Sequence, residues 1–236
     1  LGGGVYMTTG QIENSRFISN QTTHTGGGSQ GGAVVMTAGK ILNSVFIGNR
    51  SAGSAGGGAV LQTGSVPGLI SNCFFFQNGS VGSGGGVQAA TITMVDSSLE
   101  ENGLYNENSG GGLYAGCAVL KNCRFVRNRV NLNGGGVYLS ASGMIDNCHF
   151  ISNYTTFTSG GLYGGGGLHL NGTGVVHNSW FVSNTITGSG MFGGGLLELG
   201  KGPVLVTNCY FIGNQSRNSG GGIYLTGGMA TECTVR

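Results

Sequence analysis

Side chains able to act as acids, bases or nucleophiles are sparse in this chain, which has only 8 acidic residues among 236. The densest charged group combines four carboxylates with two cations: Asp96, Glu100, Glu101, Glu107, Lys121 and Arg124. Enzymes that cleave polysaccharides use a focused pair of carboxylates about 5–10 Å apart. The remaining acids are scattered, and the group itself is also typical of a solvated face. We therefore assign no catalytic residue and expect a protein that is not an enzyme.

Metal and cofactor binding is not expected either. The four histidines (His24, His149, His169 and His177) occupy different positions relative to the repeats described below, so we expect them on the surface or in loops. Cysteines spaced as Cys-x-x-Cys, which are typical of zinc sites, do not occur. The sequence therefore predicts no metal site and no cofactor.

An internal repeat must position every one of these residues. A triple glycine, or Gly-Gly-Ala, is followed by an aliphatic residue nine times: Val5, Val34, Val60, Val87, Leu113, Val137, Leu168, Leu196 and Ile223. Successive spacings are 24 to 31 residues, so about eight repeats of about 27 residues fill residues 1–236 and leave no room for a second domain. The chain starts and stops inside a repeat without a polar cap, which suggests a piece of a longer solenoid.

Each repeat carries a second anchor, Asn-(Ser/Cys)-x-Phe-x-x-Asn, found around Phe17, Phe46, Phe75, Phe125, Phe150, Phe181 and Phe211. Apolar and polar residues alternate near the glycines, as in Val137-Tyr138-Leu139, which favours short half-buried strands over helices. Short strands in a glycine-rich repeat of this length are typical of an all-β parallel β-solenoid in which each repeat forms one coil. Glycine would allow positive φ angles and close backbone approach at the corners.

Stacked coils turn each column of equivalent residues into a ladder with a spacing of about 4.8 Å. The first asparagine of the anchor is expected to form such a ladder, whose amides bond to one another and to turn backbone: Asn14, Asn43, Asn72, Asn122, Asn147, Asn178 and Asn208, with Asp96 in the fourth repeat. The phenylalanine column supplies the bulk of the core.

Five of the six cysteines fall in the column after this asparagine. Cys123 with Cys148, and Cys209 with Cys233, lie in neighbouring coils, at a spacing that a disulfide tolerates. Two interpretations stay open: disulfide pairs along the ladder, or small buried side chains that are interchangeable with serine.

The repeat resembles a known family. Phe46-Ile47-Gly48-Asn49 followed by Gly57-Gly58-Ala59-Val60 is similar to the repeat of the chlamydial polymorphic membrane proteins and of related glycine-rich surface proteins in other bacteria and in protists. The resemblance covers essentially the whole chain. It implies a right-handed parallel β-helix, exposure outside the cell or at its surface, and an adhesive or structural role.

The residue after each phenylalanine is mostly apolar: Ile18, Ile47, Phe76, Val126, Ile151, Val182 and Ile212. Strict alternation would place this column outside as an apolar contact face, which monomers rarely expose over many coils. Such a face would pack against another protein chain, through self-assembly or a surface partner. The alternative is a local bend that turns these residues inward.

Six asparagines precede Ser or Thr at the third position: Asn20, Asn49, Asn78, Asn153, Asn171 and Asn214. These are candidate N-glycosylation sites in a eukaryotic secretory context. Five of them are the last asparagine of the Phe-x-x-Asn anchor, where the variable loop starts, so we expect glycans to be tolerated there.

Composition excludes two classes of function. The net charge of +2 makes nucleic-acid binding a poor fit, and no run of 18 apolar residues could span a membrane. The sequence thus favours a non-enzymatic extracellular structural solenoid, acting as an adhesin stalk or as a unit of a surface filament. The alternatives are a carbohydrate-active β-helix enzyme, either a polysaccharide lyase or a glycoside hydrolase, and a carbohydrate-binding surface on outward tyrosines.

Overall fold

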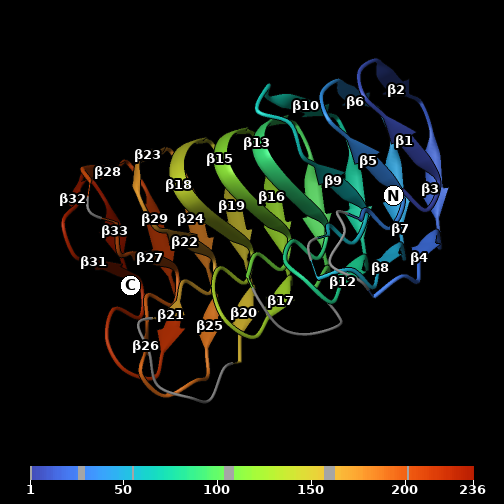
Figure 1. Cartoon of the computed structure of the whole chain (residues 1–236). Helices are drawn as coiled ribbons and strands as arrows, with labels where there is room; N and C mark the ends of the chain where they lie inside the picture. Colours follow the sequence, from blue (N-terminus) through green and yellow to red (C-terminus); the bar gives the residue numbers. More distant parts are fainter. Residues whose placement is uncertain (1, 26–29, 55, 104–108, 157–162, 201) are drawn as a thin grey trace.

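The computed structural model describes residues 2–25, 30–54, 56–103, 109–156, 163–200 and 202–236. In this part of the chain every regular element is a strand, and every strand pairs in parallel with an equivalent strand of a neighbouring coil. The coils stack along one axis from the N-terminal to the C-terminal end (Figure 1). The all-β parallel solenoid expected from the repeat is confirmed, with about eight turns between the nine equivalent strands of its main sheet.

The largest sheet has 15 strands. Its main row starts after the glycine corners: β1 (Val5–Met7), β5 (Val34–Met36), β9 (Val60–Gln62), β13 (Val87–Val95), β15 (Leu113–Lys121), β18 (Val137–Asp146), β22 (Leu168–Leu170), β27 (Leu196–Glu198) and β31 (Ile223–Leu225). A second row continues it: β2 (Gln11–Glu13), β6 (Lys40–Leu42), β10 (Gly68–Ser71), β23 (Thr173–His177), β28 (Val204–Thr207) and β32 (Met229–Thr231). The long strands β13, β15 and β18 span both rows, which joins them into one curved sheet.

A nine-stranded sheet carries the phenylalanine anchors. Its strands are β3 (Arg16–Ile18), β7 (Val45–Ile47), β11 (Phe74–Phe76), β14 (Ser98–Glu100), β16 (Arg124–Val126), β19 (His149–Ile151), β24 (Trp180–Val182), β29 (Tyr210–Ile212) and β33 (Thr234–Val235). Three small sheets close the coils: β4 (Gln21–Thr22), β8 (Arg50–Ser51) and β12 (Gly79–Ser80); β17 (Arg129–Val130), β20 (Tyr154–Thr155), β25 (Thr185–Ile186) and β30 (Gln215–Ser216); β21 (Tyr163–Gly164) and β26 (Met191–Phe192).

The core is a stack of phenylalanine rings along the solenoid axis. In the nine-stranded sheet, the middle residue of each strand from β7 to β29 points inward and is fully buried. Neighbouring rings stack nearly parallel with centroids 4.6 to 5.2 Å apart, as Phe150 does with Phe181. Leu99 takes the position in the degenerate fourth repeat. Burying each ring contributes about 2–3 kcal/mol to the coil that carries it.

The triple glycine has two separate physical roles at its corner. From Gly84 onward the first glycine takes a left-handed backbone, with φ of 68° at Gly84 itself. The second approaches the neighbouring backbone so closely that a Cβ on Gly85 would overlap the amide of Gly103. Larger residues would therefore force neighbouring coils apart. This agrees with the roles that the sequence predicts for the glycines.

Candidate functional site

The predicted asparagine ladder lies at the corner between the two large sheets, and we call it the outer ladder. All its members, Asp96 included, have left-handed φ angles of 48° to 54°, a conformation that Asn and Asp adopt more readily than most residues. Amide bonds run from coil to coil, such as Asn72 Nδ2 to Asn43 Oδ1 at 2.9 Å and Asn122 Nδ2 to Asp96 Oδ1 at 2.8 Å. Most of these side chains are exposed, so their remaining polar atoms face solvent.

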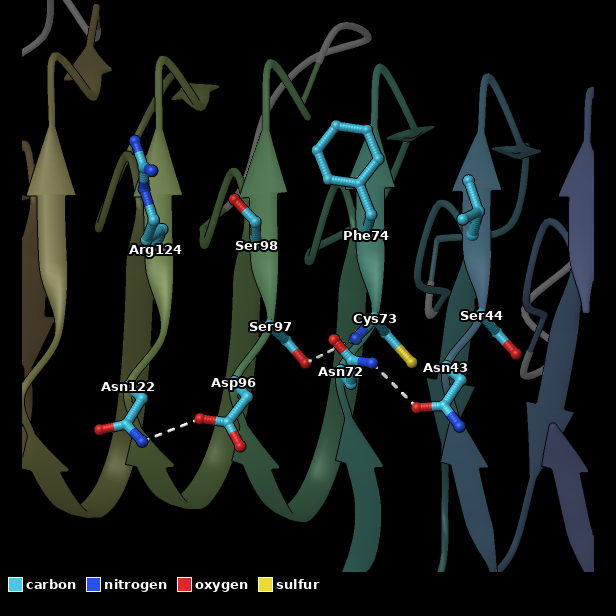
Figure 2. Close-up of a pocket in the computed structure, with 11 residues that line it drawn as sticks. Asn43, Ser44, Asn72, Cys73, Phe74, Asp96, Ser97, Ser98, Asn122 and Arg124 are labelled. Atoms are coloured by element: carbon cyan, nitrogen blue, oxygen red, sulfur yellow. Dashed lines mark hydrogen bonds between the residues drawn. The ribbon is translucent and has the colours of Figure 1, made fainter. Parts of the chain in front are cut away.

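A groove of about 500 Å³ follows this outer ladder over four coils. Figure 2 shows its three rows of side chains, one row each from the ladder, from the small residues after it, and from the first position of the next strands. Its lining is Asn43, Ser44, Val45, Asn72, Cys73, Phe74, Asp96, Ser97, Ser98, Asn122 and Arg124.

The groove offers three kinds of recognition. Its floor repeats amide donors and acceptors at the coil spacing, and Asp96 adds one carboxylate among them. Arg124 on β16 adds a guanidinium, and Phe74 on β11 adds an aromatic ring. Planar amides, a guanidinium group and an aromatic ring together suit a ligand that has many hydroxyl groups and apolar ring faces.

Thiol reactivity is suppressed at Cys73, which lines this groove, and at Cys209 in the same column. The Cys73 thiol donates to the carbonyl of Ser71 at 3.2 Å, and burial raises its pKa. Burial likewise raises the pKa of Cys209 to about 12. High pKa values keep these thiols protonated and poorly nucleophilic at neutral pH.

The disulfide hypothesis for Cys123 with Cys148 and for Cys209 with Cys233 is not supported, because the structure holds all six cysteines as free thiols. In-register residues of parallel strands point their Cβ atoms the same way at about the strand spacing of 4.8 Å, which exceeds the usual disulfide Cβ separation. The small-residue interpretation of this column describes the packing: Cys123, Cys148 and Cys209 are fully buried.

The acidic cluster of the fourth repeat is divided between two surfaces. Asp96 lies in the groove, whereas Glu100 and Glu101 lie at the opposite end of β14. There Arg127 binds Glu101 through Nε at 3.0 Å and Nη2 at 2.8 Å. Hydrogen bonds from Gln77 and Arg127 lower the pKa of Glu101, so it stays ionised. Glu107 lies outside the described residues.

The charged group identified in the sequence included Lys121 and Arg124 but not Arg127. Among the described residues, Arg127 makes the ion pairs with Glu100 and Glu101. The signal was in the repeat alignment, since Glu101 and Arg127 both stand two positions after the anchor in adjacent coils. Opposite charges at the same repeat position of adjacent coils therefore indicate an ion pair.

A second asparagine column, which we call the inner ladder, follows the phenylalanine strands: Asn20, Asn49, Asn78, Asn102, Asn128, Asn153, Asn184 and Asn214. Asn128 represents the pattern. Its Nδ2 donates to Asn153 Oδ1 at 3.0 Å and to the carbonyl of Leu99 at 2.8 Å. Its Oδ1 accepts from the backbone and the side chain of Asn102, both at 3.0 Å. The inner ladder, and not the predicted outer one, satisfies buried backbone groups.

This geometry corrects three of the candidate glycosylation sites. Asn49, Asn78 and Asn153 have no exposed surface, and their Nδ2 atoms donate within the ladder. A glycan on Nδ2 would displace those bonds and could not leave the core. Asn20 and Asn214 are half-buried at the ends of the ladder. Asn171 is exposed, which keeps it accessible to modification.

The proposed contact column faces away from the phenylalanine core. Ile18 is 51 % exposed, and Ile47, Phe76, Ile151, Val182 and Ile212 are half-buried against their neighbours in the column. Val126 is buried at 5 % exposure. The column is thus a partly covered ridge. Beside it, Trp180 stacks on Tyr210 with centroids 4.3 Å apart, so these two rings cover each other's faces.

The expectation that all histidines lie on the surface is wrong for His169, which is 3 % exposed. Its Nδ1 lies 3.0 Å from Oδ1 of Asn133, and its Nε2 is buried without a partner. Burial lowers the pKa of His169 to about 3. Of the outward tyrosines, Tyr114 and Tyr138 stack at 5.2 Å, and Tyr6 is isolated from them by the intervening coils.

Comparison with known proteins adds no identity: the chain matches no protein-family model, no curated protein and no solved structure. Within the described residues, no helix has the length and apolar character needed to cross a membrane.

Proposed function

We propose that the chain is a non-enzymatic structural solenoid, located outside the cell or at its surface, which acts as an adhesin stalk or as a unit of a surface filament. The resemblance of its repeat to the chlamydial polymorphic membrane proteins and related surface proteins supports this location. The proposal makes the repeat itself the functional feature, because the chain provides length and rigidity.

The observation that carries the proposal is that the inner ladder runs without a break along the phenylalanine core. The amide bonds run unbroken from Asn20 to Asn214. Each coil thereby completes the hydrogen bonds of the coil before it, and further coils can be added without a new topology. A rod built this way resists bending and extension, as a stalk or filament must.

Immuno-electron microscopy of the native source material tests this function. With antibody against this segment, we expect label along filaments or on hair-like surface projections. Label confined to the cell interior would refute the extracellular role. A screen for polysaccharide cleavage, with an Asp96→Asn variant as control, should give no turnover; cleavage that the variant loses would make the chain an enzyme.

The groove along the outer ladder favours a second candidate function, the binding of a glycan chain. Its amides repeat at about the strand spacing of 4.8 Å, roughly the length of one sugar ring. Arg124 and Phe74 line the same groove and add charge-assisted hydrogen bonds and ring contact. An extended polysaccharide could therefore lie along the solenoid axis.

A glycan array tests this candidate. We expect the wild-type chain to retain a set of neutral or acidic glycans, and the Arg124→Ala and Phe74→Ser variants to lose it. Arg16→Ala is the matched control, because Arg16 is exposed on the same sheet but does not line the groove. Equal binding by all four proteins would remove the groove from consideration.

A further inference from the structure

A mostly apolar and partly exposed column of side chains lies on the outer face of the strands β10 to β32, which run along the upper side of Figure 1. Its members are register partners in seven consecutive coils: Leu69, Thr93, Val119, Met144, Val175, Leu205 and Met229. We call it the outer stripe. Met144 is 56 % exposed and Met229 is 58 % exposed. Sequence analysis missed it, because it placed the apolar face beside the phenylalanines.

The face around the outer stripe is almost free of charge. On the outward positions of its seven strands, the charged residues are Lys121 and Asp146. They are register partners on β15 and β18, the two central strands, in the column two positions after the stripe and so at one edge of the face. Neither belongs to an ion pair within the described residues, and Asp146 accepts one bond from Asn178 at 3.1 Å. The stripe ends at β6, where Lys40 occupies the position equivalent to Leu69.

We propose that this face binds a second copy of the same chain in an antiparallel, two-fold symmetric dimer. The two-fold axis lies along the strands, midway between β15 and β18. Rotation about it opposes Val119 to Met144 of the second copy and Leu69 to Leu205 of the second copy. It also opposes Lys121 to Asp146 of the second copy, twice per dimer.

Regular spacing favours a second copy over an unrelated partner. Side chains of the outer stripe recur at about 4.8 Å, and ridges with this period fit best into a surface of the same period. Another copy supplies that surface, and a two-fold interface uses the same patch on both molecules. The proposed axis pairs six strands, β10 to β28, with four or five residues each on this face. They cover about 450 Å² per copy, or about 900 Å² in total, a size typical of a weak, reversible interface.

The two charges select the antiparallel arrangement. If the two solenoids packed with their axes parallel, the Lys121 column would face the column of Cys117 and Ser142. Both charges would then lose water without gaining a partner, which is costly. In the antiparallel arrangement each charge meets its opposite at the edge of an apolar patch. The dimer does not depend on whether the chain serves as a stalk or binds a glycan, so it goes beyond the proposed function.

Sedimentation velocity over a micromolar concentration series tests the proposal. We expect the wild-type chain to dimerise reversibly. The single variants Lys121→Glu and Asp146→Lys should each weaken the dimer by about tenfold or more, because each dimer then carries two like-charge contacts. Arg124→Glu, an equal change of charge on another face, should leave dimerisation unaltered.

Mixing the two single variants gives the decisive readout. In a mixed dimer, the glutamate introduced by Lys121→Glu faces the lysine introduced by Asp146→Lys, and the original pair is kept as the second contact. We therefore expect association to return in the mixture to near the wild-type level. Circular dichroism of each variant shows that it is folded. A wild-type chain that stays monomeric, or a mixture that associates no better than the separate variants, overturns the proposal.

Discussion

Removing one amide from the inner ladder should destabilise the solenoid far more than removing one from the outer ladder. The test is Asn128→Ala at the centre of the chain. Asn128 is fully buried, and its side chain makes four hydrogen bonds to three residues of the two adjacent coils. Alanine removes all four at a site with no exposed surface.

The size of the effect follows from the groups left without partners. The variant strands two N–H donors of Asn102, one on the backbone and one on the side chain. Each unsatisfied buried polar group costs about 1–3 kcal/mol, so the donors alone cost about 2–6 kcal/mol. The cavity left by the amide adds to this. We expect the free energy of unfolding to fall by about 4 kcal/mol.

The assay is equilibrium unfolding in guanidinium chloride, followed by circular dichroism and by the fluorescence of Trp180. The matched control is Asn122→Gly in the outer ladder, where the side chain is exposed and glycine accepts the φ of 54°. This variant should lose less than about 1 kcal/mol, because its partners bond to water instead. Equal losses in the two variants would refute the distinction between a buried, stabilising inner ladder and a solvated outer one.

Two further predictions concern protonation and modification. The pKa of His169 is about 3 in the fold but about 6.5 unfolded. The unfolded chain therefore binds the proton more strongly, and the free energy of unfolding should fall by about 2 kcal/mol from pH 7 to pH 5. Urea titrations should find this loss in the wild type but not in His169→Gln. After secretion from a eukaryotic host, peptide mapping should find glycan on Asn171 and none on Asn49, Asn78 or Asn153; glycan on a buried site would contradict the inner ladder.

The architecture could be predicted because the repeat is visible in the sequence itself. Recurring glycines mark the corners, and the phenylalanines mark one inward position per coil. Stacking then follows from geometry, since each coil can bury its apolar face only on the next one. For this reason the parallel solenoid, its number of turns and the aromatic core all agree with expectation.

The roles of the two asparagine columns could not be read from spacing alone, because both stand at corners of the same strand. A chemical signal was nevertheless present. The outer column accepts Asp96 in the fourth repeat, whereas the inner column keeps asparagine there as Asn102. A buried ladder needs a side chain that both donates and accepts, and a carboxylate cannot donate. The column that tolerates aspartate is therefore the solvated one.

The same reasoning locates specificity on this molecule. Inward columns must repeat, since every coil packs on an equivalent neighbour. Their residues therefore stabilise the fold but do not distinguish one coil from another. Outward columns are free to differ from coil to coil, and a partner can recognise one stretch of the solenoid only where they do. Phe74 and Arg124 differ from Val45 and Ser98 in the same row of the groove, and Lys121 and Asp146 interrupt an uncharged face. These breaks in periodicity, more than the repeat itself, distinguish this segment from any other stretch of a regular solenoid.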